Sequence, residues 1–185
     1  MRKLINGGTM EITARERIST GFLKMDKLTI KMPDGNEMVR EVMQKKDVVA
    51  VLAITDDKRV ILCKQPRAGA NELESIEIPA GLIDEGETPE AAAKRELLEE
   101  TGYETAYLKK LGYFFSDPAC CNSKTYLFFT DRVKKVADQH LDESEFLEYF
   151  DVSLKEMKEL VERCIIHDAN STIAYYRAQK YWPEA

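Results

Sequence analysis

Residues 81–102 read GLIDEGETPEAAAKRELLEETG, and this acidic segment constrains the chain more than any other. Its second half is predicted to form a helix, because Thr88 suits the N-cap, Pro89 the first helical position and Gly102 the position just past the last turn. Successive residues of a helix lie about 100° apart, so three of the glutamates crowd one stripe of its surface. These are Glu96, Glu99 and Glu100.

Like charges at this spacing repel each other and destabilise a helix by roughly 0.2–0.5 kcal/mol per pair. A hard divalent cation reverses that effect, because Mg²⁺ prefers oxygen ligands and a high density of negative charge. A solvated acidic face is the other interpretation of the stripe. We favour metal binding, because Pro-Ala-Gly at 79–81 precedes the helix and Gly102 ends it.

The segment also resembles the sequence box of the Nudix hydrolases. In that box a Gly and a Glu are followed by Arg-Glu-apolar-x-Glu-Glu-x-Gly-apolar at fixed spacing. The matching residues are Gly81, Glu87, Arg95, Glu96, Leu97, Glu99, Glu100 and Gly102, with Tyr103 where an aliphatic residue is usual. The resemblance implies hydrolysis of a nucleoside diphosphate linked to another group, with Mg²⁺ or Mn²⁺ as cofactor.

The same resemblance implies roles within the box. Arg95 is expected to be structural and to hold the Glu87 region by an ion pair. The backbone carbonyl of Ala80 is expected to bind the metal ions together with Glu96, Glu99 and Glu100. Because Mg²⁺ accepts neutral oxygens beside carboxylates, a turn carbonyl suits this role.

Composition narrows the class of protein further. The chain has 185 residues and a formal net charge of −6, with no basic stripe, so nucleic acid is not an expected partner. No apolar run reaches the length of a membrane span, and the N-terminus lacks the apolar core of a signal peptide. The four cysteines show no Cys-x-x-Cys spacing, which indicates reduced thiols in a cytoplasmic protein.

The order of predicted elements indicates an α+β fold. Residues 1–46 are expected to form an N-terminal β arm, with an antiparallel hairpin that turns at Asp34-Gly35, and 47–185 the hydrolase domain. Residues 48–54 read as a buried strand on which 59–65 pairs back, and a short strand covers 75–78. Strands are also expected near 104–115 and 124–131. One helix is expected to begin at a capping box of Ser153 and Glu156, and a last helix to span 170–181. With the resemblance, this order implies a Nudix α/β/α sandwich with a mixed central sheet.

Features outside the box resemble one Nudix subfamily, the ADP-ribose pyrophosphatases. Pro118 stands where these enzymes carry a proline, and 21–42, 65–67 and 77–81 match the subfamily's pattern. The likeness runs from about residue 17 to 180. It implies cleavage of ADP-ribose to AMP and ribose 5-phosphate.

The resemblance also places a general base on a loop well downstream of the box, here HLDESEFLEYF at 140–150. Glu143 matches the base and Glu145 a further metal ligand, and alternate residues of an extended loop point the same way. Asp142 and Glu148 are neighbouring rivals, and an ordinary acidic loop is the alternative. Glu99 and Glu100 would complete the catalytic set.

Substrate contacts are implied from both subunits of an obligate homodimer with exchanged arms. Phe22 and Leu23 match positions that sandwich the adenine, and Arg40 and Glu41 match a pair that reaches substrate from the other subunit. The resemblance also assigns contacts within the pocket to Arg67, Leu82 and Pro118. A guanidinium fits paired phosphate oxygens. Burial of Phe22 in the core and a plain surface role for Arg67 are the alternatives.

One departure leaves the sugar open. After Pro118 the subfamily usually has a Gly and then a Glu, whereas residues 118–123 here read PACCNS. Other nucleoside diphosphate sugars, such as GDP-mannose, or broad specificity are therefore an alternative. A non-catalytic nucleotide sensor is disfavoured, because every acid of the box is present. His140 and His167 show no ligand or triad spacing, and His140 is expected to be a solvent-facing loop residue.

Overall fold

The computed structural model of the protein describes residues 2–3, 8–21, 23–141 and 146–182. None of the helices in these ranges combines the length and the apolar composition that a membrane crossing requires. The chain separates into two compact units. The first comprises Met1–Lys46 together with Phe115–Lys124, and the second comprises Asp47–Phe114 with Thr125–Ala185.

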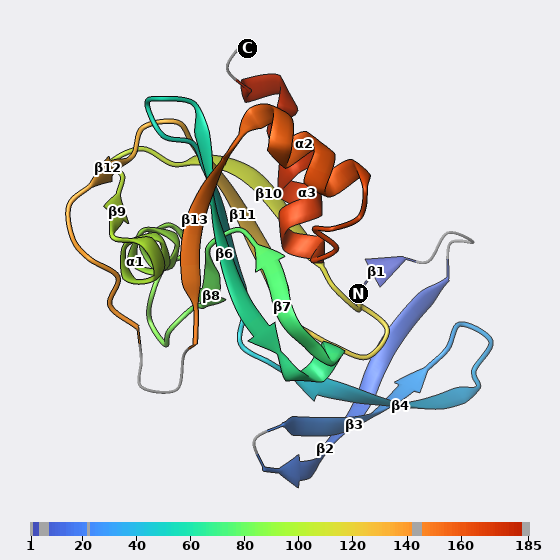
Figure 1. The fold of residues 1–185 in the computed structure, drawn as a ribbon. Coiled ribbons are helices and arrows are strands. Elements are labelled where there is room, and N and C mark those ends of the chain that lie inside the picture. The colour runs from blue at the N-terminus through green and yellow to red at the C-terminus, as the bar shows by residue number, and fades with distance from the viewer. Residues whose placement is uncertain (1, 4–7, 22, 142–145, 183–185) are drawn as a thin grey trace. The chain divides into compact units, whose positions relative to one another are not determined.

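The first unit is an antiparallel sheet with the strand order β1-β2-β3-β4 (Figure 1). Its strands are β1 (Arg2–Lys3), β2 (Thr9–Thr20), β3 (Lys24–Lys31) and β4 (Glu37–Gln44). The predicted hairpin is confirmed: Gly35 has a φ of +86° in the turn between β3 and β4, and the Asp34 carboxylate accepts the Asn36 N–H at 3.0 Å. Segment 115–124 joins this unit through a β-bridge between Met43 and Cys121.

The second unit contains a mixed sheet, as predicted, because β11 pairs with β5 in parallel and β5 pairs with β8 antiparallel. The strand order of that sheet is β10-β11-β5-β8, and a second sheet has the order β13-β6-β7. The bounds are β5 (Val48–Ala53), β6 (Arg59–Arg67), β7 (Glu72–Glu77), β8 (Ala80–Leu82), β10 (Lys109–Phe115), β11 (Lys124–Thr130) and β13 (Glu148–Ser153). A short 3₁₀ turn, η1 (Ala68–Ala70), links β6 to β7.

One prediction about strands is wrong, and another is confirmed only in part. Residues 59–65 do not pair back on 48–54: a single bridge, Ile54 to Val60, links β5 and β6 within the described residues. The reason is that both edges of β5 are taken by β11 and β8, while β6 bonds β13 and β7. The strand expected near 104–115 is divided into β9 (Tyr103–Glu104) and β10, because β9 pairs with β12 (Lys134–Lys135) instead.

Helices cover the strands of this unit on opposite sides (Figure 1). On one side lies α1 (Pro89–Thr101), and on the other lie α2 (Leu154–Glu162) and α3 (Ala169–Ala178), with the short turn η2 (Gln179–Tyr181) after α3. Alternate side chains of β5 enter two separate cores: Val49 and Val51 pack with α1, whereas Ala50 and Leu52 pack with α2 and α3. The predicted α/β/α sandwich is confirmed.

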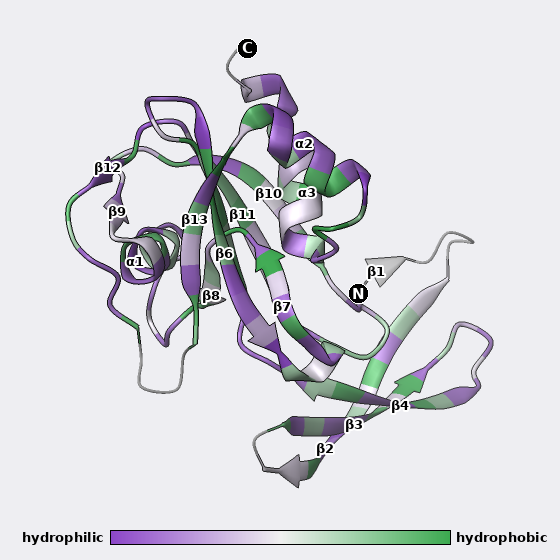
Figure 2. Ribbon diagram, in the orientation of Figure 1, coloured by the Kyte–Doolittle hydropathy of each residue, from purple (hydrophilic) through white to green (hydrophobic). Residues whose placement is uncertain are grey.

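Burial of these strands provides the main stabilisation of the unit, since a fully buried Val or Leu contributes about 1.5–3 kcal/mol. The strand β6 changes character along its length, from green to purple in Figure 2. Its residues Val60 and Leu62 are fully buried, but Lys64, Gln65 and Arg67 at its far end are polar and more exposed. This polar end of β6 reaches the candidate site.

Candidate active site

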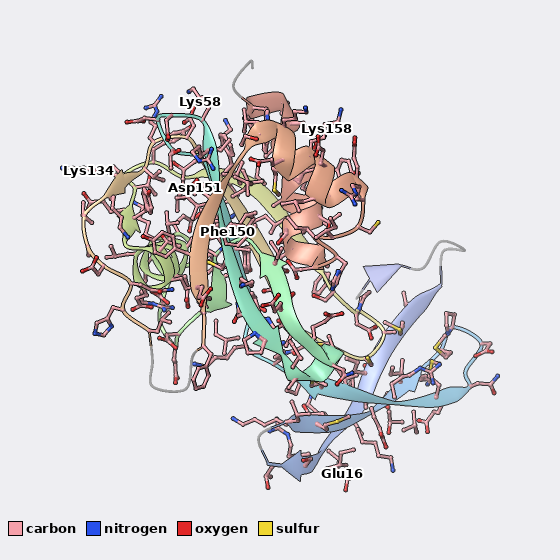
Figure 3. The ribbon with its side chains drawn as sticks, viewed as in Figure 1. Glu16, Lys58, Lys134, Phe150, Asp151 and Lys158 are labelled. Carbon is pink, nitrogen blue, oxygen red and sulfur yellow. The ribbon has the colours of Figure 1, made fainter. Side chains whose placement is uncertain are left out.

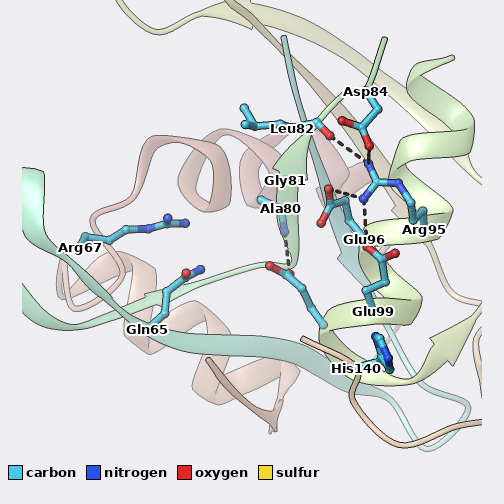
Figure 4. A pocket seen from close by; sticks show the side chains of 11 residues that line it. Gln65, Arg67, Ala80, Gly81, Leu82, Asp84, Arg95, Glu96, Glu99 and His140 are labelled. Atoms are coloured by element: carbon cyan, nitrogen blue, oxygen red, sulfur yellow. Dashed lines mark hydrogen bonds and ion pairs between the residues drawn. The ribbon is translucent and has the colours of Figure 1, made fainter. Parts of the chain in front are cut away.

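The second unit contains a cavity of about 470 Å³ lined by α1, β8 and the polar end of β6. Figure 4 shows Gln65 and Arg67 on one side of it and Glu96 and Glu99 on the opposite side. The lining residues are Gln65, Arg67, Ala80, Gly81, Leu82, Asp84, Arg95, Glu96, Glu99, Glu100 and His140. The predicted acidic stripe and the predicted residues Ala80, Arg67 and Leu82 are therefore brought to one place.

Local capping sets the position of the stripe. The Thr88 side chain accepts the Ala91 N–H at 3.2 Å at the start of α1, and Gly102, with φ of +69°, donates its N–H to the Leu98 carbonyl at 2.7 Å at the end. These are the predicted caps, and they are confirmed. Glu96 is 9% exposed and Glu100 is 5% exposed, so the interpretation as a solvated acidic face is wrong for both.

Arg95 holds the carboxylates in place. Its Nε and Nη2 donate to the two oxygens of Glu87 at 3.1 and 2.9 Å, which confirms the predicted ion pair. Nη2 also donates to the Leu82 carbonyl at 3.0 Å. The bidentate bond from Arg95 lowers the pKa of Glu87, and the same bond raises the pKa of Arg95. Both groups are therefore charged at neutral pH.

A further contact of Arg95 was not predicted. One nitrogen, Nη1, donates to Glu96 Oε1 at 2.8 Å and to Glu99 Oε2 at 2.9 Å. A single positive group thus bridges two of the three glutamates of the stripe. The i,i+4 spacing of Arg95 and Glu99 is the sequence signal that could have indicated the second of these bonds.

Replacement of Arg95 by Met is expected to lower the free energy of unfolding by about 1–3 kcal/mol. Its side chain is 29% exposed and that of Glu87 is 17% exposed, so a charge of Glu87 would be left without its partner in a half-buried place. Thermal unfolding followed by circular dichroism measures the change. Arg132→Met is the control, because Arg132 is 73% exposed and lies 3.9 Å from Asp131. Equal losses in both variants would contradict the structural role of Arg95.

Glu100 is held from the strand side of the cavity. The Ala80 N–H donates to Glu100 Oε2 at 3.0 Å, and the Cys63 thiol lies 3.8 Å from the same oxygen. Burial raises the pKa of Cys63 well above its usual value, and the charge of Glu100 raises it further. Cys63 therefore stays a neutral thiol that donates to the carboxylate.

Gly81 provides the space into which Glu96 reaches. A Cβ at Gly81 would lie 2.1 Å from the Glu96 carboxyl carbon and 2.1 Å from its Oε1. The carboxylate therefore lies directly against the backbone of β8 at Gly81, the residue after Ala80, whose carbonyl the resemblance assigns to metal. Carboxylate oxygens are the type of ligand that a hard divalent cation prefers. Within the described residues no three acidic, His or Cys groups are arranged so that they could hold a metal ion by themselves, and Arg95 bridges two of the glutamates.

Gly81→Ala is expected to displace Glu96 and to lower turnover by about tenfold to a hundredfold, because misplacement of a catalytic group by about 1 Å has effects of that size. The measurement is the initial rate of hydrolysis of ADP-ribose, the substrate that the resemblance implies, at saturating Mg²⁺. Gly69→Ala is the control, because a Cβ at Gly69 meets nothing within 4 Å. Unchanged turnover in Gly81→Ala would show that the position of Glu96 does not matter.

Arg67 lies across the cavity from α1. Its Nε and Nη2 donate to the Glu77 carboxylate at 2.8 and 2.5 Å, and this bond raises the pKa of Arg67. Glu77 is buried, at 3% exposure, and orients the guanidinium along the wall of the cavity. This geometry is consistent with a contact to substrate phosphate, which stays a prediction.

The other predicted site residues fall into two groups. Phe22, Glu143, Glu145 and the rival Asp142 lie outside the described residues. The first unit holds Leu23, which is 49% exposed, Arg40 and Glu41 on β4, and Pro118 in an exposed turn. Their roles stay predictions.

Three lining residues were missed: Gln65, Asp84 and His140. His140 is exposed, as predicted, but it also lines the cavity, because its backbone N–H donates to the Glu99 carbonyl at 2.8 Å. Gln65 precedes the Pro66-Arg67 pair, and Asp84 lies inside the acidic segment. Both are therefore close in the chain to residues that were predicted to belong to the site.

Comparison with known proteins agrees with this fold. The family model for the NUDIX domain matches residues 44–169, and the chain belongs to the Nudix hydrolase family. An ADP-ribose pyrophosphatase of Bacillus subtilis (strain 168) is 35% identical over 163 residues, which cover 87% of this chain and 88% of that relative. A methanol dehydrogenase activator of Bacillus methanolicus is 32% identical over 161 residues, 86% of each chain.

A solved structure described as an ADP compounds hydrolase superimposes with a TM-score of 0.79 and covers 93% of each chain. Its sequence identity is 24%, so this likeness shows the fold alone.

Proposed function

We propose that this protein hydrolyses the pyrophosphate bond of ADP-ribose and releases AMP and ribose 5-phosphate. The observation that carries the proposal is the cavity that Glu96, Glu99 and Glu100 line together with Arg67, with Arg67 on the side opposite Glu96 and Glu99 (Figure 4). Such a site combines oxygen ligands for cations with a guanidinium for phosphate. The ADP-ribose pyrophosphatase of Bacillus subtilis, 35% identical over most of both chains, supports this choice of substrate.

We propose Mg²⁺ as the cofactor, with Mn²⁺ as a substitute. Glu96, Glu99, Glu100 and the Ala80 carbonyl would hold it, with Glu145 as a further ligand. When bound, the metal supplies charge for the phosphate oxygens and lowers the pKa of water. Arg95 and the Ala80 N–H orient the carboxylates, and Arg67 binds the substrate's phosphate. Glu143 would take the proton from the attacking water.

The test is the initial rate of ADP-ribose hydrolysis, measured beside ADP-glucose, GDP-mannose and NADH, in Mg²⁺ and then in excess EDTA. We expect metal-dependent release of AMP, with kcat/KM for ADP-ribose higher by at least about tenfold, or about 1.4 kcal/mol. Turnover that persists in EDTA would refute the metal assignment. Absence of turnover for every compound would favour the nucleotide sensor.

A second candidate is hydrolysis of other nucleoside diphosphate sugars, and segment 118–123 favours it. This loop lacks the Gly and Glu of the subfamily, and polar bonds hold it to the strand end: Asn122 Nδ2 donates to Gln44 Oε1 at 2.9 Å and the Ser123 hydroxyl donates to the Lys46 carbonyl at 2.7 Å. A faster rate with ADP-glucose or GDP-mannose than with ADP-ribose would establish this candidate.

We also propose a homodimer in which the arm of one subunit, residues 1–46, completes the cavity of the other. Phe22, Leu23, Arg40 and Glu41 would then contact substrate in the neighbouring subunit, and Pro118 would lie near its sugar. The support is the resemblance to the subfamily.

We also propose the cytoplasm as the location of the protein. The support is its free cysteines, which are Cys63, Cys120, Cys121 and Cys164.

A complementation experiment tests the exchanged arms. Arg40→Ala damages the arm and Glu100→Gln damages the cavity, so a heterodimer of the two has one undamaged site only if arms are exchanged. We expect the heterodimer, purified with two tags, to regain about half of the wild-type turnover per dimer. Activity no higher than the mean of the two homodimers would contradict exchange.

A further inference from the structure

A second cavity, of about 700 Å³, lies where α3 and η2 meet β10. It shares no lining residue with the candidate active site. Its walls include three basic side chains, Lys110, Arg177 and Lys180, and two tyrosines, Tyr176 and Tyr181. Such a concentration of positive charge is notable in a chain whose net charge is −6.

The basic groups contact neutral partners. The ammonium of Lys110 lies 5.7 Å from the ring centroid of Tyr126, and that of Lys180 lies 5.0 Å from the centroid of Tyr181. Arg177 Nη1 donates to the Tyr113 carbonyl at 3.3 Å. Within the described part of the chain, none of these three cations forms an ion pair with a carboxylate. Their charge is therefore available to an anion.

The backbone of β10 makes room for the guanidinium. Gly112 has a φ of +103°, a conformation that side chains rarely adopt, and a Cβ there would lie 3.4 Å from Arg177 Nη1. A fourth cation, Lys109, lies 5.0 Å from the Tyr181 ring centroid. Like charges gathered around one ring repel each other, and a bound anion relieves that repulsion.

The tyrosines add an aromatic surface. Tyr176 is 56% exposed and packs its ring edge-on against Tyr175, with 5.1 Å between centroids, which leaves much of the ring accessible. Guanidinium and ammonium groups bind phosphate, and exposed aromatic rings stack on nucleobases. We propose that this cavity is a second binding site, for a nucleoside phosphate whose phosphate contacts Lys110, Arg177 and Lys180 and whose base stacks on Tyr176.

The chain carries its own reporter for this site. Its single tryptophan, Trp182, directly follows η2 and packs against Tyr175 with 5.5 Å between ring centroids. Titration of the full-length protein with AMP, followed by the fluorescence of Trp182, is expected to give a saturable change. Inorganic phosphate is expected to bind at least about tenfold more weakly, because it has no base to stack.

Two double variants locate the signal. Lys110→Ala/Lys180→Ala removes two exposed cations from the cavity and is expected to raise the Kd for AMP at least about tenfold. Lys155→Ala/Lys158→Ala removes the same number of charges from α2, where both side chains are exposed, and is expected to leave the Kd unchanged (Figure 3 labels Lys158). Tyr176→Ala is expected to weaken AMP without altering the Kd for phosphate.

Some results would overturn the proposal. They are no saturable change in the wild type, the same Kd in both double variants, or equal affinity for phosphate and AMP. Binding is read without hydrolysis, so the outcome is independent of the proposed ADP-ribose activity. AMP bound in the active site would be insensitive to the two lysines.

Discussion

Glu100→Gln is expected to lower metal-dependent turnover by about three orders of magnitude, which corresponds to about 4 kcal/mol of lost transition-state stabilisation. The change removes one negative charge from the cavity and keeps the size of the side chain. A Gln oxygen can still accept the Ala80 N–H that Glu100 now accepts at 3.0 Å, so the fold is expected to persist. The measurement is kcat for ADP-ribose at saturating Mg²⁺, with circular dichroism as the check of folding.

Glu90→Gln is the matched control, because Glu90 lies on the same helix but is exposed and does not line the cavity. Its turnover is expected to equal that of the wild type. Near-wild-type kcat in Glu100→Gln, at any Mg²⁺ concentration, would refute the assignment of Glu100 as a metal ligand.

Glu143→Gln is expected to lower kcat by about two to four orders of magnitude with little change in KM, the effect of losing a general base. Glu143 lies outside the described residues, so this prediction rests on the resemblance of 140–150 to the family's loop. The measurement is the pH profile of kcat/KM in the wild type and the variant. In the wild type, protonation of the base lowers kcat/KM at low pH. The variant lacks this base, so its profile should lack that fall.

The rival carboxylates provide the comparison for Glu143. Glu148 begins β13, its side chain is 82% exposed, and it lies 3.8 Å from Lys64. Glu148→Gln is therefore expected to leave kcat unchanged. Loss of turnover in Glu148→Gln or Glu145→Gln, together with a silent Glu143→Gln, would move the base to the other residue.

Predictions that depend on neighbouring residues in the chain agree with the structure. The caps of α1 at Thr88 and Gly102, and the capping box of Ser153 and Glu156, are confirmed. Each of these devices joins groups within a few residues, so the sequence contains both partners. The ion pair of Arg95 with Glu87 was also predicted, from the resemblance, and its partners are 8 positions apart in the chain.

Predictions of pairing between distant segments were less successful. The apolar runs at 48–54 and 59–65 and the short turn between them favoured a hairpin, but β11 and β8 occupy the edges of β5. The strand β13 was not predicted, although it pairs with β6 over six register positions from Glu148 to Ser153. A strand edge bonds whichever segment packs there, and a hydrophobic pattern does not identify that segment.

The sequence by itself determined the acidic helix, its ends and the stripe of Glu96, Glu99 and Glu100, because helical geometry and capping act over a single turn. Only the tertiary structure decided what faces that stripe. It brought Arg67 and its partner Glu77 across the cavity, placed His140 beside Glu99 and set the Glu96 carboxylate against Gly81. These contacts join residues far apart in the chain, and they form only when sheets and helices pack into one core.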